Sequence, residues 1–372
     1  MKKNILKKII IFYPSFERGG VENILINLIN FFLKKKIKIV LITSNFNKDL
    51  FKNKLFYCKY VKLSPFSFLP DRINKALSAS KTLKNELKNS EKKNTIVFSL
   101  QGSSLAILIS KFLRFKIVVR NGEDVLGSTI HSESKIQSLI VLLIKIFLYN
   151  FADKIITNSK GSGNSLKKIL IKKKKIHTIY NPYLKKLYKN SVNKRKKYLL
   201  SIGRLVKEKD FHNLIIAFNT IKQKIPNYKL IIIGDGHLKD ELKDLVNNFG
   251  LSKRIIFTGW KLKLKKYYVN SKLFILNSLY EGLGNVVIDA ANYNLPIITT
   301  NCNSREIIDY GKGGFIVPIK NPKLLANKIL FCLNNNKISI KKSKYAKKRI
   351  KRFDCEINCN NYFKLISKTI NE

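Results

Sequence analysis

The chain has 372 residues, of which 45% are apolar and 11% aromatic, so wholesale disorder is excluded. That length fits two domains of roughly 150–190 residues better than one. Lysine and arginine number 73 against 23 acidic residues, giving a formal net charge of +50. Such a chain attracts phosphates, anionic lipids and nucleic acids. Because both halves are basic and also rich in Asn and Ile, the codon usage of an AT-rich genome is an alternative origin of the charge.

The cysteines and the apolar runs narrow the class of protein. Five cysteines are an odd number and imply no disulfide framework, so we expect a reducing, cytoplasmic compartment. Cys355 and Cys359 have helical spacing but no nearby histidine, which argues against zinc. The first apolar run ends at Tyr13-Pro14 without a cleavage site and predicts a strand, not a signal peptide. The run 139–151 is shorter than the ~20 residues that span a bilayer.

The first half of the chain alternates short apolar runs, typical of buried strands, with amphipathic helical segments. Continuous apolar strands between helices predict a parallel sheet covered on both faces. The stretch 44–94 is less regular. The expected strands are 8–13, 37–43, 95–100, 116–120, 154–158 and 176–180, and the expected helices are 19–33, 103–112, 136–150 and 161–170.

Asn181-Pro182 ends this pattern, and the polar, basic stretch that follows reads as a linker. The alternation then restarts with strands 198–202, 229–233, 255–258, 273–276, 297–300 and 315–317, and with helices 210–224, 238–249, 285–293 and 322–334. The tail 338–370 is helical and basic. We therefore predict an α/β protein with two doubly wound domains and a cleft between them. The expected parts are a first domain 1–183, a linker 184–197, a second domain 198–345 and a closing helix 346–372 that can pack back on the first domain.

Three strand–loop–helix segments have residues suited to a phosphorylated ligand. Gly19 and Gly20 follow the first strand and open a helix, whose N-terminal amides suit an anion; a plain turn is the alternative. Arg204 and Lys209 follow the first strand of the second domain, where two cations could hold a diphosphate. In the third segment, Glu281 precedes the helix N-terminus around 285–287.

Asp289 lies eight positions after Glu281, and acidic residues are rare in this chain. Two carboxylates flanking an anion site predict hydrogen bonds to sugar hydroxyls at both ends of a nucleotide sugar. A capped helix with an incidental acid is the alternative reading.

With these residues the chain resembles a retaining glycosyltransferase of family 4, which has the GT-B fold. The resemblance runs in order along nearly the whole chain. Its matching segments are Gly19-Gly20, Tyr180-Asn181-Pro182, Gly203-Arg204-Leu205 through Lys209, Gly234-Asp235-Gly236, Phe257-Thr258-Gly259-Trp260, Glu281-Gly282-Leu283-Gly284 through Ala290, Leu295-Pro296-Ile297-Ile298, Arg305-Glu306-Ile307-Ile308 and 313–318.

The resemblance implies a hexosyltransferase-type enzyme with two Rossmann-like domains. Such an enzyme transfers a sugar from a nucleotide sugar, with a UDP-sugar favoured, and uses no metal or other cofactor. The acceptor would be a glycan or lipid-linked molecule of surface polysaccharide or lipopolysaccharide synthesis. Arg204 and Lys209 would bind the diphosphate, Glu281 the donor sugar and Asp289 the ribose. The pocket would be completed by Gly19, Gly20, Gly234, Gly236, Gly282, Leu283, Gly284, Asn285, Val286 and Val287.

Two features depart from the family pattern. Asp289 stands where the family has a second glutamate, so the ribose contact is shortened by one methylene. On the acceptor side the chain has Arg120, Asn121 and Glu123 after a first-domain strand, with His131 further on, where similar enzymes often have His or Asp. Loop polarity is the alternative explanation for these residues.

The basic clusters 34–36, 48–62 and 172–175 and the apolar segment 63–70 suit peripheral docking on an anionic membrane, on the inner face of the cell membrane. Two other functions remain as alternatives. A GT-B sugar-nucleotide epimerase would need more acid–base residues than Glu281. A non-catalytic nucleic-acid binder would need a recognition module, and the charge is diffuse, so we expect no specific nucleic-acid partner.

Overall fold

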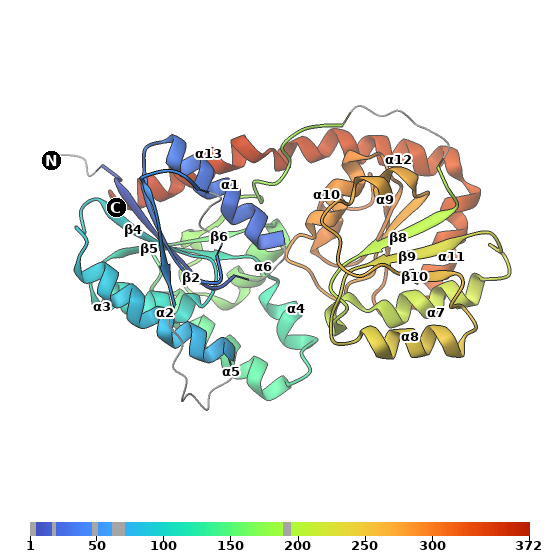
Figure 1. Cartoon of the computed structure of the whole chain (residues 1–372), viewed down its shortest axis with the longest axis horizontal. Coiled ribbons are helices and arrows are strands. Elements are labelled where there is room, and N and C mark those ends of the chain that lie inside the picture. Colours follow the sequence, from blue (N-terminus) through green and yellow to red (C-terminus); the bar gives the residue numbers. More distant parts are fainter. Residues whose placement is uncertain (1–4, 17–19, 47–50, 62–70, 189–194) are drawn as a thin grey trace. The chain divides into compact units, whose positions relative to one another are not determined.

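The computed structural model describes residues 5–16, 20–46, 51–61, 71–188 and 195–372. It divides into two compact units, which Figure 1 shows in full. Unit 1 comprises Met1–Lys185 and Phe353–Glu372, and unit 2 comprises Lys186–Arg352. Each unit is built on one parallel sheet with helices on both faces.

The sheet of unit 1 has seven parallel strands in the order β3-β2-β1-β4-β5-β6-β7. Alternate residues of β1 point to opposite faces: Ile9 and Ile11 enter one core, and Ile10 and Phe12 enter the other. The strands are β1 Lys8–Ser15, β2 Lys38–Ser44, β3 Phe56–Tyr60, β4 Thr95–Ser99, β5 Lys116–Asn121, β6 Lys154–Thr157 and β7 Ile176–Thr178.

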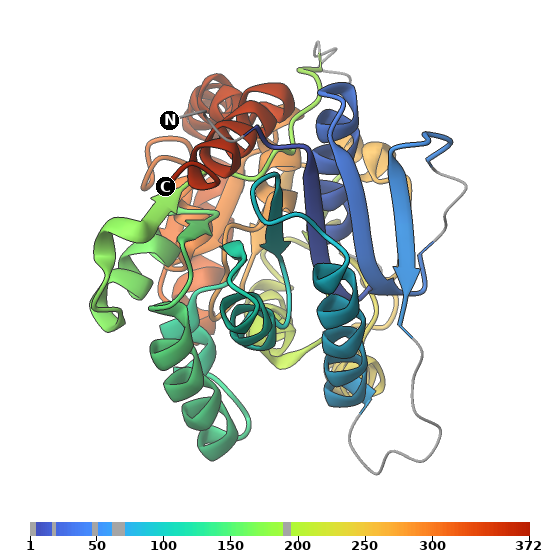
Figure 2. The same cartoon turned by 90° about the vertical axis from the view of Figure 1, so that its left-hand side faces the viewer.

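Helices cover both faces of this sheet (Figures 1 and 2). Helix α1 (Gly20–Lys34) packs with the C-terminal helix α13 (Cys355–Thr369) on one face. The opposite face carries α2 Asp71–Lys88, α3 Ser103–Phe112, α4 Val125–Ile130, α5 Lys135–Tyr149 and α6 Lys160–Ile169, followed by the short helix η2 Lys173–Lys175. The last helix of the chain therefore completes the core of the first unit.

Unit 2 has six parallel strands in the order β10-β9-β8-β11-β12-β13. The strands are β8 Tyr198–Ile202, β9 Lys229–Ile233, β10 Ile255–Phe257, β11 Leu273–Leu276, β12 Ile297–Thr300 and β13 Phe315–Val317. The helices are η3 Lys207–Lys209, α7 Phe211–Ile221, α8 Lys239–Asn248, α9 Lys265–Asn270, α10 Asn285–Asn292, η4 Asn303–Glu306, α11 Pro322–Asn334 and α12 Asn336–Arg349. The short helix η5 (Ile350–Phe353) follows at the boundary with unit 1. One large apolar cluster fills the space between the sheet and α7, α8 and α11.

The structure corrects the expected elements in three places. The irregular stretch 44–94 contains β3 and α2; only Ala79, Leu83 and Leu87 form the apolar core of α2, so its helical pattern is faint. The short helices α4 and α9 were also missed. The tail is not one helix, because η5 separates α12 from α13.

Candidate active site in unit 2

The candidate site of unit 2 lies where the order of the sheet strands reverses. The chain runs from β8 outward to β9 and β10, then returns to the other side of β8 with β11. The loops after β8 and β11 therefore leave the same edge of the sheet in opposite directions. Ligands of doubly wound sheets bind in the crevice outside the carboxyl ends of the strands at such a switch point.

Lys209 and Glu281 meet across this switch point. Lys209 ends η3 after β8, and its ammonium donates a hydrogen bond to Glu281 Oε1 in the loop after β11. Ser278 Oγ donates to the same carboxylate oxygen at 3.0 Å. The two charged side chains are only 17% and 12% exposed. Because an ammonium has three N–H bonds, Lys209 can hold Glu281 and still donate to an anionic ligand.

Backbone contacts hold the two loops together. The Leu279 N–H donates to the Glu208 carbonyl at 2.8 Å, which joins η3 to the loop after β11. Asn303, in η4 after β12, donates from Nδ2 to the Glu281 carbonyl at 3.0 Å. Asn303 was not among the predicted site residues, because its contribution comes from a third loop that only the sheet order brings near.

Gly234 and Gly236 let the loop after β9 pack against the loop after β8. A Cβ atom on Gly234 would lie 1.8 Å from the Gly203 carbonyl oxygen, and one on Gly236 would lie 2.3 Å from the Leu205 carbonyl oxygen. The Leu205 N–H also donates to the Asp235 carbonyl at 2.9 Å. These glycines thus have a packing reason to be glycine, beside any ligand contact.

Helix α10 begins beside Glu281, with Asn285, Val286 and Val287 as its first residues. Gly284 caps the helix in a left-handed conformation, φ 76°, and a Cβ atom there would lie 2.3 Å from Ser304 Oγ. Gly282 and Leu283, which precede it, are buried. The N–H groups of the first turn of a helix carry a partial positive charge that suits an anion.

Asp289 lies on the second turn of α10, next to an aromatic stack. Tyr293 stacks on Tyr188 with ring centroids 4.7 Å apart and on Tyr268 at 5.4 Å. Tyr268 also donates from its hydroxyl to the Val286 carbonyl at 3.2 Å. Burial, together with Tyr188 and Asp289, raises the pKa of Tyr293. This stack fixes the helix that presents Asp289.

Arg204 differs from Lys209 in exposure. Its side chain is 67% exposed, and it donates to Glu208 Oε1 at 3.0 Å. An exposed ion pair of this kind contributes little to stability, so the guanidinium is free to change partners when a ligand arrives.

Asp210 is a partly buried acid that was not predicted as a site residue. It follows Lys209 directly, with a left-handed backbone, and burial raises its pKa to about 6. Its Oδ2 atom is buried and has no hydrogen-bond partner among the described residues. Asp210 directly follows the segment 203–209 that matches the family pattern, but the sequence alone does not distinguish it from a solvated helix-capping residue.

Candidate residues of unit 1 and comparisons with known proteins

Unit 1 has its own switch point, between β1 and β4. Gly20 begins α1 there, whereas Gly19 lies outside the described residues. Sequence reasoning missed Glu22 in the first turn of α1. It is 8% exposed, and Tyr13 donates to its Oε1 at 2.8 Å. Its Oε2 atom has no hydrogen-bond partner in the described part of the chain, so a buried carboxylate oxygen remains available here.

The predicted acceptor-side residues occupy different environments. Arg120 is buried, and its guanidinium donates to Asn181 Oδ1 at 2.6 Å and to the Tyr362 hydroxyl at 3.2 Å. These contacts give Arg120 a structural role, joining β5 to the end of the first domain and to α13. Asn121 is also buried and donates to the carbonyl of Glu123.

Glu123 and His131 lie at the two ends of the α4 region. The side chain of Glu123 is 47% exposed and forms an ion pair with Lys145 of α5. His131 ends α4, where its N–H donates to the Gly127 carbonyl at 3.1 Å. The structure therefore separates these four residues into two buried and two at least partly exposed positions.

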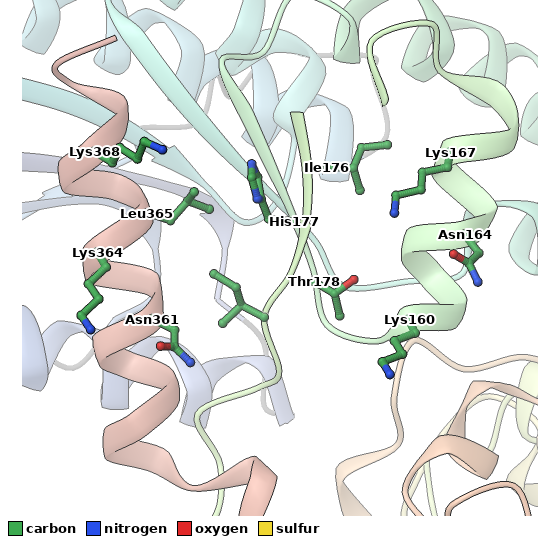
Figure 3. Close-up of a pocket in the computed structure, with 11 residues that line it drawn as sticks. Lys160, Asn164, Lys167, Ile176, His177, Thr178, Asn361, Lys364, Leu365 and Lys368 are labelled. Atoms are coloured by element: carbon green, nitrogen blue, oxygen red, sulfur yellow. The ribbon is translucent and has the colours of Figure 1, made fainter. Parts of the chain in front are cut away.

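Unit 1 has a concave surface that contains none of the predicted site residues (Figure 3). This cavity of about 770 Å³ lies along edge strand β7, between α6 and α13. Four lysines line this cavity together with His177. Burial, followed by the charges of nearby lysines such as Lys154, lowers the pKa of His177. The cavity is lined by Lys160, Asn164, Lys167, Ile176, His177, Thr178, Ile179, Asn361, Lys364, Leu365 and Lys368.

The described residues contain no group of three or more His, Cys, Asp or Glu side chains that could hold a metal ion. No helix within the described ranges has both the length and the apolar character needed to cross a membrane.

Two family models match the chain, one for each half. The model described as Glycosyltransferase Family 4 matches residues 18–183, and the model described as Glycosyl transferases group 1 matches residues 185–350.

Two relatives illustrate the similarity in sequence. The chain is 26% identical to the N-acetylgalactosamine-N,N'-diacetylbacillosaminyl-diphospho-undecaprenol 4-alpha-N-acetylgalactosaminyltransferase of Campylobacter jejuni, over 94% of this chain and 96% of that protein. It is 34% identical to an uncharacterized glycosyltransferase of Methanocaldococcus jannaschii, over 54% of this chain and 52% of that protein.

Solved structures show the same fold. Anabaena HepE in complex with UDP-glucose superposes with a TM-score of 0.79 at 20% identity, covering 97% of this chain and 99% of that one. Sucrose-phosphate synthase from Thermosynechococcus elongatus superposes with a TM-score of 0.81 at 16% identity, covering 97% and 98%.

Proposed function

The chain is a glycosyltransferase that belongs to family 4 and has the GT-B fold, and from that premise we propose that it uses a nucleotide sugar, favouring a UDP-sugar, with retention of configuration. The observation that carries this proposal is the Lys209–Glu281 pair across the switch point of unit 2, beside the N-terminus of α10. It combines a cation, a carboxylate and helix amides at the ligand-binding edge of the sheet.

Each side chain has a role in this proposal. Lys209 and Arg204 bind the diphosphate and stabilise the charge that grows on it as the sugar leaves. Glu281 accepts hydrogen bonds from hydroxyls of the donor sugar, and its ion pair with Lys209 orients both groups. Asp289 accepts a hydrogen bond from the ribose. The amides of 283–287 complete the donor pocket, with the glycines 234 and 236 shaping the neighbouring loops.

We also propose that the acceptor is a glycan or lipid-linked molecule and that transfer takes place at the cytoplasmic face of an anionic membrane. The printed name of the Campylobacter relative includes a diphospho-undecaprenol acceptor. The net charge of +50 favours anionic surfaces. The predicted docking segment 63–70 lies outside the described residues.

The test is calorimetry with a panel of nucleotides and nucleotide sugars, first without added metal and then with EDTA. One UDP-sugar should bind, and EDTA should leave its affinity unchanged. If EDTA abolished the binding of all nucleotide sugars, the proposal that the protein uses its donor without a metal would be contradicted. NMR of the product then distinguishes transfer from epimerisation. An epimerase inverts a stereocentre of the donor sugar, whereas a transferase attaches the sugar to an acceptor.

Two variants test whether the nucleotide sugar binds at this site: Glu281→Gln within the site and Lys207→Gln as its control. Glu281→Gln removes the charge at the switch point, whereas Lys207 is an exposed neighbour on η3. We expect weaker binding of the nucleotide sugar by the first variant and wild-type binding by the second. Equal affinities for both would place the donor elsewhere.

A further inference from the structure

Helix α5 carries its apolar residues on its outer side. A surface helix normally buries its apolar stripe and exposes its polar face. Here the residues that contact the core are Leu142, Leu148 and Tyr149. Six of the seven exposed apolar residues of α5 follow i, i+3, i+4, i+7, i+8 and i+11 spacing and are each 43–76% exposed; the seventh is Val141. The six are Ile136, Leu139, Ile140, Leu143, Ile144 and Phe147, and we call them the α5 stripe.

A basic loop is held at the C-terminal end of this stripe. The Asn150 side chain, which follows α5, accepts hydrogen bonds from the N–H groups of Ile171 and Lys172, both at 3.1 Å. Lys175 donates back to the Asn150 carbonyl at 3.3 Å. The lysines 172–174 are exposed, and the side chain of Ile171 is 84% exposed. Apolar and cationic groups thus share one surface of unit 1.

We propose that the α5 stripe and lysines 172–174 dock the chain on an anionic membrane, with α5 lying in the plane of the interface. The stripe would enter the boundary between headgroups and acyl chains, and the lysines would contact the anionic headgroups. The 15 residues of α5 extend about 22 Å, less than the ~30 Å of a hydrocarbon core, so the helix lies along the surface and does not cross. The inference deepens the proposed function and rests on it for the membrane-borne acceptor.

Charge decides between a membrane and a second copy of the chain as the occupant. Each copy carries +50, so two copies repel each other, while the same charge draws each one to anionic lipid. The position of α5 agrees with docking from outside, because Figures 1 and 2 both show it at the side of unit 1 away from α1 and α13.

The first test is co-sedimentation with vesicles of phosphatidylcholine, with and without phosphatidylglycerol. The triple variant Leu139→Gln, Leu143→Gln, Phe147→Gln should lower partitioning to the anionic vesicles at least ~10-fold, because three exposed apolar groups no longer enter the interface. The matched control replaces three exposed apolar residues elsewhere: Leu324→Gln, Ile338→Gln, Ile357→Gln. Equal losses in both variants would overturn the proposal.

The second test separates the lysines from the total charge. Lys172→Gln, Lys173→Gln, Lys174→Gln should weaken binding to anionic vesicles by about 10-fold, an effect that high salt abolishes. The control Lys341→Gln, Lys344→Gln, Lys348→Gln removes the same charge from exposed positions of α12. If the control loses as much binding, diffuse charge and not this loop attracts the membrane.

The third test reads the environment of the stripe itself. Phe147→Trp, made in a chain whose single tryptophan is changed by Trp260→Phe, should shift its emission to the blue only when anionic vesicles are added. Emission that is already blue in buffer would mean that protein covers the stripe, and sedimentation velocity would show whether a second copy does so. Blue emission in buffer therefore overturns membrane docking, whether or not a second copy covers the stripe. Calorimetry with UDP-sugars on the same variants tests the proposed function independently, because vesicle binding does not require a nucleotide.

Discussion

The two units have the same architecture but treat a positive charge at the carboxyl ends of their strands differently. In unit 2, Lys209 and Glu281 face each other at the loop edge of the sheet, with Arg204 exposed beside them. In unit 1, Arg120 is buried and bonded to Asn181 and Tyr362, within the scaffold. The difference teaches that the fold supplies an edge where ligands can bind, while the loops decide which unit has charged groups free to act there.

The largest expected effect concerns the loop packing that builds the unit 2 site. Gly234→Ala would place a methyl group 1.8 Å from the Gly203 carbonyl oxygen, at a backbone φ of +146°. We expect a loss of about 3–5 kcal/mol in the free energy of unfolding of unit 2. Urea denaturation followed by circular dichroism measures it.

Gly259→Ala is the matched control, since φ is +67° but a Cβ atom there meets nothing within 4 Å. It should cost only about 1–2 kcal/mol of left-handed strain. Similar losses in both variants would show that close loop packing does not matter.

The second prediction breaks the charge contrast directly. Lys209→Ala, Glu281→Ala and Arg204→Ala should each lower kcat/KM by at least ~10²-fold, the scale for losing one preorganised charge contact. Steady-state kinetics with the nucleotide sugar that binds in the calorimetric panel measures the effect. Lys207→Ala should retain activity, and near-wild-type turnover in two of the three variants would reject the assigned site.

The third prediction sharpens the contrast from unit 1. Tyr362→Phe removes a hydroxyl that accepts from buried Arg120. The free energy of unfolding should fall by about 1.5–3 kcal/mol, because a buried charged donor loses one of its two partners. The activity per folded molecule should stay unchanged if Arg120 is structural. A selective rise in the KM for the acceptor, with stability preserved, would instead return Arg120 to the acceptor site.

The smallest expected effect is a pH-dependent one at Asp210. Burial raises the pKa of this carboxyl from 3.8 to about 6, so its ionisation above pH 6 destabilises the folded state. As pH falls through 6 toward 3.8 the folded carboxyl takes up a proton before the unfolded one, and the cost disappears. Asp210→Asn should therefore stabilise by roughly 1 kcal/mol at pH 8, reduced for partial exposure, and by nothing near pH 4. Thermal unfolding across this pH range checks the sign, and stabilisation that is equal at both ends would refute it.

Much of the fold was predictable because its strands are continuous apolar runs. The parallel sheets follow from segments such as Ile9–Phe12 and Ile231–Ile233, which are buried on both faces. Helix α2 was missed because three buried apolar residues among 18 leave a weak pattern. In the sequence, the apolar run 139–151 indicated only a segment too short to span a membrane. The sequence shows the periodicity of the α5 stripe, but not that its side chains are exposed.

The sequence by itself determined the two-domain α/β organisation, the excess of positive charge and the identity of the site motifs, because each depends on residues close together in the chain. Tertiary structure decided which of those residues meet. Lys209 and Glu281 are 72 positions apart and touch only because β8 and β11 are neighbours in the sheet. It also decided that Arg120 is buried and that α5 exposes its apolar side, since exposure is set by what packs against a residue and not by its neighbours along the chain.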